Sequence, residues 1–217
     1  MPDLNFRITG VDPVDRGLTP LLHFQLEITN APATESIHTV MVQAQIQIQS
    51  PQRTYSASEK EKLGDLFGTP NRWSETLRNK LWTHANASIR AFSGRTLAAL
   101  PVSCTYDLNV SATKYFYALE GGEVPLLFLF SGTVFYAGEG GHLQVHQIPW
   151  EKECTYRMPV QVWQALMDHH YPGIAWLSLN RDMFDRLYDY RRRQGFATWD
   201  QAIERLLPTA EDVEPAP

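Results

Sequence analysis

A stretch of strictly alternating side chains between Thr39 and Gln49 constrains the fold more than any other feature of the chain. Successive side chains of a β-strand point to opposite faces of a sheet, so this strand has one apolar face and one uncharged polar face. The pattern is typical of an antiparallel sheet packed on one side, not of the doubly covered parallel sheet of an α/β enzyme. The apolar positions are Val40, Val42, Ala44, Ile46 and Ile48, and the opposite positions are Met41, Gln43, Gln45, Gln47 and Gln49.

Other segments with strand-like patterns surround this one. We expect strands at 4–9, 21–29, 81–92, 101–110, 124–136 and 142–149, separated by turns rich in glycine and proline. In 81–92, period two places Leu81 on the lightly apolar face and Trp82 on the polar face. Segment 124–136 is almost entirely apolar, which favours a central strand covered on both faces. Leu143, Val145 and Ile148 indicate that the segment after it is its hairpin partner.

Helical signals occur in the middle of the chain and dominate its last third. Segment 56–67 changes to a helical period, and Ser58 is a candidate N-cap. Segment 111–119 fits either a short helix or a continued strand. Three more helices are predicted at 159–170, from 178 or 180 to 193, and at 198–207, the last with Thr198 and Gln201 spaced as a capping box.

Together these elements predict an α+β fold. Residues 1–157 would form an antiparallel β-sandwich-like domain with one inserted helix. Residues 158–207 would form a C-terminal helical element of about three helices packed on that domain. Residues 208–217 are acidic and carry prolines, which is typical of a disordered tail.

Composition excludes several classes of function. The net charge of −5 offers no basic surface for nucleic acid, which needs Lys and Arg to neutralise phosphates. The longest apolar run, 124–130, is too short to span a membrane. The N-terminal residues lack the basic and apolar regions of a signal peptide, so we expect an unprocessed cytoplasmic protein.

We find no catalytic, cofactor or metal-binding motif in the sequence, and we expect no cofactor. Cys104, Asp107 and Lys114 are candidates for a buried polar site, with Cys104 as a nucleophile or metal thiolate if a base lies nearby. The alternatives are an inert buried thiol and a structural ion pair between Asp107 and Lys114. His142 and His146 share a strand face but would lie roughly 13 Å apart, which argues against a metal site with Cys154.

Three surface features are candidates for binding a protein partner. The glutamine face, with Gln43, Gln45 and Gln47, is neutral and rich in hydrogen-bond donors and acceptors. It is either simply solvated or docks a partner by strand addition or by face packing. Arg72 with Trp73, and separately Trp150, are residue types that dominate interface hot spots, although a tryptophan in such a loop can also fill the edge of a core.

Four blocks of the sequence resemble a bacterial family known only as a domain of unknown function. Its members are encoded beside genes for high-affinity, oxygen-tolerant nickel–iron hydrogenases of the actinobacterial type. The resemblance extends from about residue 55 to 207 and implies a cytoplasmic accessory to hydrogenase assembly or function. The family has no established activity, so it implies no catalytic residues. The matching segments are Tyr55-Ser56, Leu66 to Gly68 and Arg72-Trp73; Cys104 to Leu108 and Lys114 to Phe116; Pro125-Leu126 and Leu129 to Phe135; and Ile148 to Glu153.

Our leading hypothesis is a non-enzymatic interaction module whose partner, from this resemblance, is a hydrogenase subunit or maturation factor. The alternative is a small-molecule or metal-binding protein, with or without enzymatic activity, centred on Cys104, Asp107 and Lys114. A self-associating protein, a homo-oligomer with aromatic strands pairing across a two-fold axis, is a third hypothesis.

Overall fold

The computed structural model describes residues 1–14, 17–105, 110–175, 177 and 179–207. It confirms the α+β class, with two antiparallel sheets and several helices. The chain forms two compact units, Met1–Ile174 and Ala175–Pro217. This division differs from the predicted boundary between residues 157 and 158, because the first C-terminal helix belongs to the first unit. The predicted tail at 208–217 lies outside the described residues.

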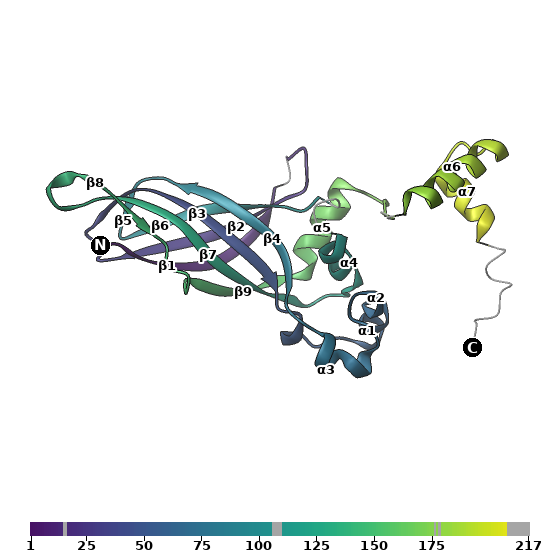
Figure 1. The fold of residues 1–217 in the computed structure, drawn as a ribbon, viewed down its shortest axis with the longest axis horizontal. Helices are drawn as coiled ribbons and strands as arrows, with labels where there is room; N and C mark the ends of the chain where they lie inside the picture. Colours follow the sequence, from purple (N-terminus) through teal and green to yellow (C-terminus); the bar gives the residue numbers. More distant parts are fainter. Residues whose placement is uncertain (15–16, 106–109, 176, 178, 208–217) are drawn as a thin grey trace. The chain divides into compact units, whose positions relative to one another are not determined.

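In the described part of the first unit, nine strands form two sheets (Figure 1). The three-stranded sheet has the order β1-β2-β6, with β1 at Asp3–Pro13, β2 at Leu21–Ala31 and β6 at Arg95–Ser103. The six-stranded sheet has the order β4-β3-β7-β8, with β4 at Lys80–Ile89, β3 at Ser36–Ile48, β7 at Glu123–Ala137 and β8 at Leu143–Gln147. Two further strands join it, β5 (Phe92–Ser93) on β3 and β9 (Glu153–Pro159) on β7.

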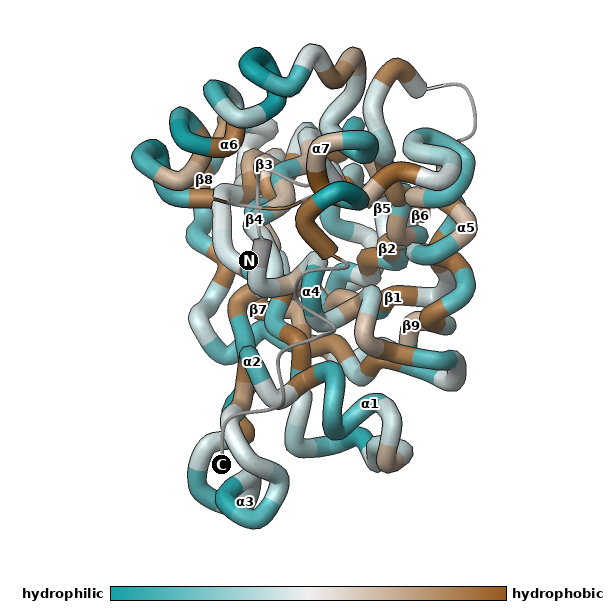
Figure 2. Tube along the Cα trace, turned by 90° about the vertical axis from the view of Figure 1, so that its right-hand side faces the viewer, coloured by the Kyte–Doolittle hydropathy of each residue, from teal (hydrophilic) through white to brown (hydrophobic). Residues whose placement is uncertain are grey.

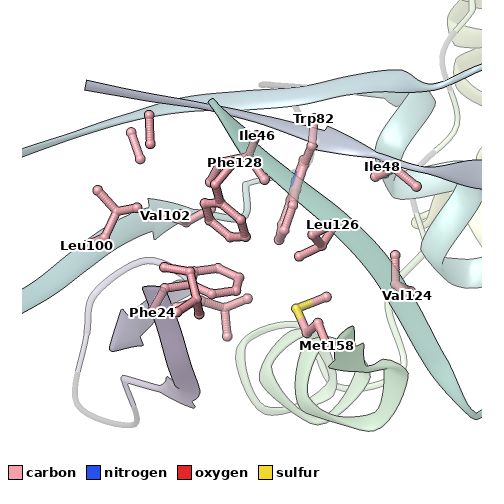
Figure 3. Close-up of a cluster of buried hydrophobic side chains, with 14 of the residues drawn as sticks. Phe24, Ile46, Ile48, Trp82, Leu100, Val102, Val124, Leu126, Phe128 and Met158 are labelled. Carbon is pink, nitrogen blue, oxygen red and sulfur yellow. The ribbon is translucent and has the colours of Figure 1, made fainter. Parts of the chain in front are cut away.

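The core lies between these two sheets, as the alternation in β3 requires. The five residues on the predicted apolar face, Val40, Val42, Ala44, Ile46 and Ile48, are each at most 2% exposed. Figure 3 shows Phe24 of the three-stranded sheet and Phe128 of the six-stranded sheet in one apolar cluster, and their ring centroids lie 5.2 Å apart. Edge-to-face packing of this kind adds stability beyond the area that the rings bury.

Strand β7 changes its partner halfway along one edge. Its first half, Glu123–Leu129, pairs with β9, and its second half, Thr133–Ala137, pairs with β8. Gly132 lies between these halves with φ +134°, and a Cβ there would lie 2.0 Å from the backbone oxygen of Met41. No side chain fits at such a distance, so glycine is required for this close approach of β7 to β3.

A bulge in β4 overturns the predicted faces of Leu81 and Trp82, whereas the rest of the strand keeps its predicted faces, with Ala85 and Ile89 buried. Ile46 pairs with Thr83 and Gln47 with Leu81, so Trp82 is the extra residue of the bulged strand. The extra residue shifts the alternation by one position. Trp82 is therefore buried and packs against Phe24, whereas Leu81 is 49% exposed.

Short helices gather at one end of the sandwich, and the β7–β8 hairpin lies at the other (Figure 1). Segment 56–67 forms α1 (Ala57–Lys62) and α2 (Gly64–Phe67), and its N-cap is Ser56 with a full capping box, not Ser58. The predicted strand at 101–110 is the end of β6, which stops at Ser103, and residues 106–109 lie outside the described part. The remaining helical segments of this unit are η1 (Ser50–Gln52), η2 (Pro70–Arg72), α3 (Trp73–Thr76), α4 (Val110–Ala118), η3 (Glu139–Gly141) and α5 (Val160–His170).

The ambiguous segment 111–119 is helical, within α4. Phe116 of α4 stacks on Trp163 of α5 with ring centroids 4.9 Å apart. Both side chains are buried, so α4 and α5 extend the apolar core beyond the sheets. No helix among the described residues is long and apolar enough to cross a membrane.

The second unit contains α6 (Arg181–Gln194) and α7 (Trp199–Leu206). Asn180 caps α6, and the capping box of Thr198 and Gln201 at α7 is confirmed. Most of α6 is hydrophilic (Figure 2). The guanidinium of Arg191 lies 4.2 Å from the centre of the Trp199 ring, a cation–π contact that joins the two helices.

Candidate functional site

The glutamine residues of β3 lie on the outer side of the six-stranded sheet, away from the three-stranded sheet. Gln43 faces solvent, while Gln45 and Gln47 are half-buried beside their neighbours. Gln49 instead turns inward and is 7% exposed. Cross-strand pairs extend this surface over β4, β3, β7 and β8. We call it the neutral face; it consists of Leu81, His84, Asn86 and Ser88; Met41, Gln43, Gln45 and Gln47; Leu127, Leu129, Ser131, Thr133 and Phe135; and Leu143, Val145 and Gln147.

The neutral face consists of amides, hydroxyls, aliphatic groups, one imidazole and one phenyl ring, and its positions on β4, β3, β7 and β8 carry no Lys, Arg, Asp or Glu. Strand β9, which pairs with the first half of β7, borders this face with the charged residues Glu153 and Arg157 on the same side of the sheet. Exposed aliphatic side chains lie among the amides, including Met41 at 59% and Leu81 at 49%. A surface of this kind can exchange hydrogen bonds and apolar contacts with another protein without desolvating a charge.

The outer side of the three-stranded sheet has a different character. There Glu27 accepts hydrogen bonds from Arg7, at 2.7 Å, and from Arg95. Burial raises the pKa of Glu27, but these hydrogen bonds and the two positive charges outweigh it, so the pKa is lowered overall. Ionic side chains of this kind are usual on a solvated sheet face, and the neutral face lacks them.

Strand addition at the glutamine strand is excluded by the sheet order. Strand β3 is hydrogen-bonded to β4 along one edge and to β7 along the other, so its backbone has no free edge. Of the two predicted modes of docking a partner, only packing against the face of the sheet is compatible with this order. The expectation that 124–136 is covered on both faces is also wrong, because Leu127 and Leu129 on the outer side are only half-buried.

Arg72 and Trp73, predicted to form one surface contact, lie in different environments. Trp73 is 8% exposed, its indole N–H donates to the backbone oxygen of Gly68 at 2.9 Å, and its ring packs against Phe67. Arg72 is exposed and lies 3.8 Å from the carboxylate of Glu75. Trp73 is therefore part of the core and not a surface contact, in agreement with the alternative that a tryptophan in this loop fills the edge of a core.

Trp150 is placed as a surface residue, in the turn between β8 and β9. Its side chain is 89% exposed. The backbone N–H of Lys152 donates to the oxygen of Pro149 at 3.1 Å and closes the turn that presents it. An indole held outward on a hydrogen-bonded turn is a preorganised apolar contact.

The predicted buried polar site is not assembled. Cys104 is 5% exposed, and burial raises the pKa of its thiol to about 12. Lys114 lies on the surface, where its amine is 3.9 Å from the carboxylate of Asp65. Asp107 lies outside the described residues. The cavity beside Cys104 has a volume of about 10 Å³, room for about one water molecule. A buried thiol of raised pKa next to such a small space is a structural residue and a poor nucleophile.

The other cysteine and the histidines do not form a ligand set. Burial raises the pKa of Cys154 to about 11. His146 belongs to β8 and His142 directly precedes that strand. Among the described residues, no group of three His, Cys, Asp or Glu side chains is placed to hold a metal ion.

Sequence reasoning missed an ionic clamp at the helical end of the sandwich. Arg53 donates to the carboxylate of Glu59 and to the backbone oxygen of Gly121, each at 2.7 Å, and to that of Glu123 at 2.6 Å. Burial raises the pKa of Glu59, but hydrogen bonds from the backbone N–H groups of Glu120 and Ser56 and from Arg53 lower it overall. The capping-box spacing of Ser56 and Glu59 was a local signal for the carboxylate, but nothing in the sequence indicated its distant partners.

The sequence reasoning also missed that the side chains of β8 are exposed. Leu143, Val145 and Ile148 correctly predicted a hairpin strand paired with β7, but Leu143 and Val145 are 62% and 56% exposed, and only Ile148 is buried. The available signal was the polar majority of Leu143–Gln147, with Gln144, His146 and Gln147, next to the glycines at 140 and 141.

Comparisons with known proteins give a family and weak structural likenesses. A comparison with curated proteins found no match. Among solved structures, the chain is similar to a solution structure from the late embryogenesis abundant (LEA) class, with 15% identity over 73% of this chain and 72% of that one and a TM-score of 0.32. It is also similar to a protein designated ApaA from Bordetella pertussis, with 12% identity over 72% and 94% of the two chains and a TM-score of 0.26.

A β-glucosidase from Kluyveromyces marxianus shows 8% identity over 72% of this chain and 15% of that one, with a TM-score of 0.25. At these TM-scores the likenesses carry no argument about function. The model of a family of unknown function, DUF6084, matches residues 1–215, so the chain belongs to this family.

Proposed function

We propose that this protein is a non-enzymatic interaction module that binds a protein partner through the neutral face. The observation that carries the proposal is the composition of that face. Four strands present amides and hydroxyls with exposed aliphatic groups between them, and the ionic residues that usually keep such a face solvated occur only at its border, as Glu153 and Arg157 on β9.

The energetics of this surface favour protein binding over simple solvation. Glutamine and asparagine amides lose hydrogen bonds to water on docking, but a partner with complementary groups restores them. Met41, Leu81 and Val145 are each about half exposed or more, and burying them against a partner would stabilise the complex. Trp150, close to the β8 end of this sheet, supplies a side chain of the type that dominates interface energies.

The resemblance to proteins encoded beside nickel–iron hydrogenase genes supports a hydrogenase subunit or maturation factor as the partner. In this role the chain would act as an accessory to assembly or function, without performing chemistry itself. Its surface would hold a subunit by shape and hydrogen bonding.

A direct binding assay tests the proposal. The purified chain is mixed with each hydrogenase subunit and maturation protein in turn, and binding is measured by calorimetry. The test variants are Gln43→Lys and Gln45→Lys, which place a charge in the centre of the neutral face. The control is Ala99→Lys, at an exposed position on the three-stranded sheet.

We expect each glutamine variant to weaken binding at least about tenfold and the Ala99→Lys control to leave it unchanged. Thermal unfolding of each variant verifies that the fold is intact. Binding to none of these proteins would refute the hydrogenase assignment. Binding that all three variants retain would refute the use of the neutral face.

A further inference from the structure

Strand β8 is an open edge of the six-stranded sheet. It pairs with β7 on one side only, and the sheet order ends with it. Its side chains are largely exposed, including Leu143 at 62% and Val145 at 56%. An open edge is a template for another strand, so the orientation of its backbone groups decides what can pair with it.

Two backbone hydrogen bonds fix that orientation. Gly138 N–H donates to the oxygen of His142, and Ile148 N–H donates to the oxygen of Gly132, each at 2.9 Å. Hydrogen-bonded and non-hydrogen-bonded pairs alternate along an antiparallel ladder, so Gln144 and His146 direct their N–H and C=O groups toward β7. Leu143, Val145 and Gln147 therefore direct theirs away from β7, to the open edge.

The sequence of β8 lacks the features that normally protect an open edge. Exposed edge strands usually carry Lys, Pro or a bulge that prevents pairing with another chain. The five residues Leu-Gln-Val-His-Gln contain no Lys and no Pro, and their register with β7 is regular. The strand is also free of carboxylates, so two identical edges would meet without charge repulsion.

We propose that β8 pairs antiparallel with β8 of a second copy of this chain, about a two-fold axis at Val145. In this register Val145 faces Val145 of the second copy as a hydrogen-bonded pair, and Leu143 faces Gln147 on either side. On the opposite side of the sheet, Gln144 faces His146, so an amide meets an imidazole and polar groups pair with polar groups. The strand is thus complementary to itself.

Trp150 follows β8 in a turn, so its exposed indole lies near the paired edge. A two-fold axis perpendicular to the sheet keeps the two neutral faces on the same side. The inference does not rest on the proposed function, because it uses the backbone edge of β8, although Val145 also belongs to the neutral face.

The first test is the mass in solution. Sedimentation equilibrium of the whole chain over a wide range of concentration should show reversible association from 24.8 kDa to twice that mass. Val145→Pro removes a donor that points away from β7, so it weakens the dimer and keeps the β7–β8 ladder. Val145→Lys places two like charges at the axis. Each should raise the dissociation constant at least about tenfold, whereas the control Ala99→Lys, at an exposed position on β6 of the other sheet, should not change it.

The second test is register-specific disulfide formation. Val145→Cys should form a covalent dimer under mild oxidation, because paired residues across an antiparallel ladder lie within disulfide reach. Leu143→Cys alone should not, but a mixture of Leu143→Cys with Gln147→Cys should. The wild-type chain, with its native Cys104 and Cys154, is the background control.

A wild-type chain that stays monomeric at every concentration overturns the proposal, even if β8 captures another protein. A dimer that survives both Val145→Pro and Val145→Lys also overturns it, because another surface must then hold the copies together. Disulfide formation by Leu143→Cys in preference to Val145→Cys overturns the register.

Discussion

The ionic clamp between Arg53 and Glu59 allows a quantitative prediction for stability. We consider the substitution Glu59→Ala. The Glu59 side chain is 6% exposed and that of Arg53 is 9% exposed, so the pair is shielded from water. The carboxylate accepts three hydrogen bonds, from Arg53 at 2.7 Å and from the N–H groups of Ser56 and Glu120 at 2.9 Å each. The substitution removes all three hydrogen bonds and leaves the guanidinium without its counter-charge.

Breaking a buried ion pair by removing one partner costs about 3–5 kcal/mol. Here Arg53 keeps the backbone oxygens of Gly121 and Glu123, and these contacts offset part of the loss. We therefore expect Glu59→Ala to lower the free energy of unfolding by about 3 kcal/mol, near the lower limit. Glu59→Gln, which keeps one acceptor oxygen, should lose less.

Urea unfolding followed by circular dichroism measures the difference. The matched control is Glu61→Ala, on the exposed side of the same helix, which should change stability by less than about 0.5 kcal/mol. A loss of under about 1 kcal/mol for Glu59→Ala would show that the clamp does not stabilise the fold and would refute the reasoning.

The same clamp predicts a pH dependence. The pKa of Glu59 is lowered from its ordinary value of 4.5 in the folded state. The unfolded state therefore takes up the proton first, so the contribution of Glu59 is complete above about pH 4.5 and is lost as the pH falls through the folded pKa. The stability difference between wild type and Glu59→Ala should shrink on acidification below that value. A difference that stays constant would contradict the assignment.

The remaining predictions concern single residues at other sites. Gly132→Ala should cost about 3–5 kcal/mol of unfolding free energy in urea, because its Cβ would meet the Met41 oxygen at 2.0 Å and its φ of +134° disfavours a side chain. Cys104 should resist alkylation at neutral pH, followed by mass spectrometry, and react only after unfolding; rapid labelling of the native protein would contradict its raised pKa. Trp73→Ala should destabilise by about 3–5 kcal/mol, whereas Trp150→Ala should change stability by less than about 0.5 kcal/mol, and equal losses would contradict their different burial.

Local patterns in the sequence determined the sandwich and its neutral face. A period of two assigns each side chain of an extended strand to one face, so the alternation alone places Val42 and Gln43 on opposite sides of the sheet. Capping chemistry is equally local, and it identified the start of α7 at Thr198. Such predictions hold because their physical cause lies within a few residues of the position that they describe.

Only the tertiary structure decided which faces are covered and which edges are open. The bulge that buries Trp82 depends on pairing with β3, and the burial of Trp73 depends on rings contributed by other segments. Likewise, β8 resembles a hairpin strand in the sequence, but its exposure follows from the strand order, which leaves it at the edge of the sheet. Contacts between residues distant in sequence determine these properties, so they cannot be predicted from a local pattern.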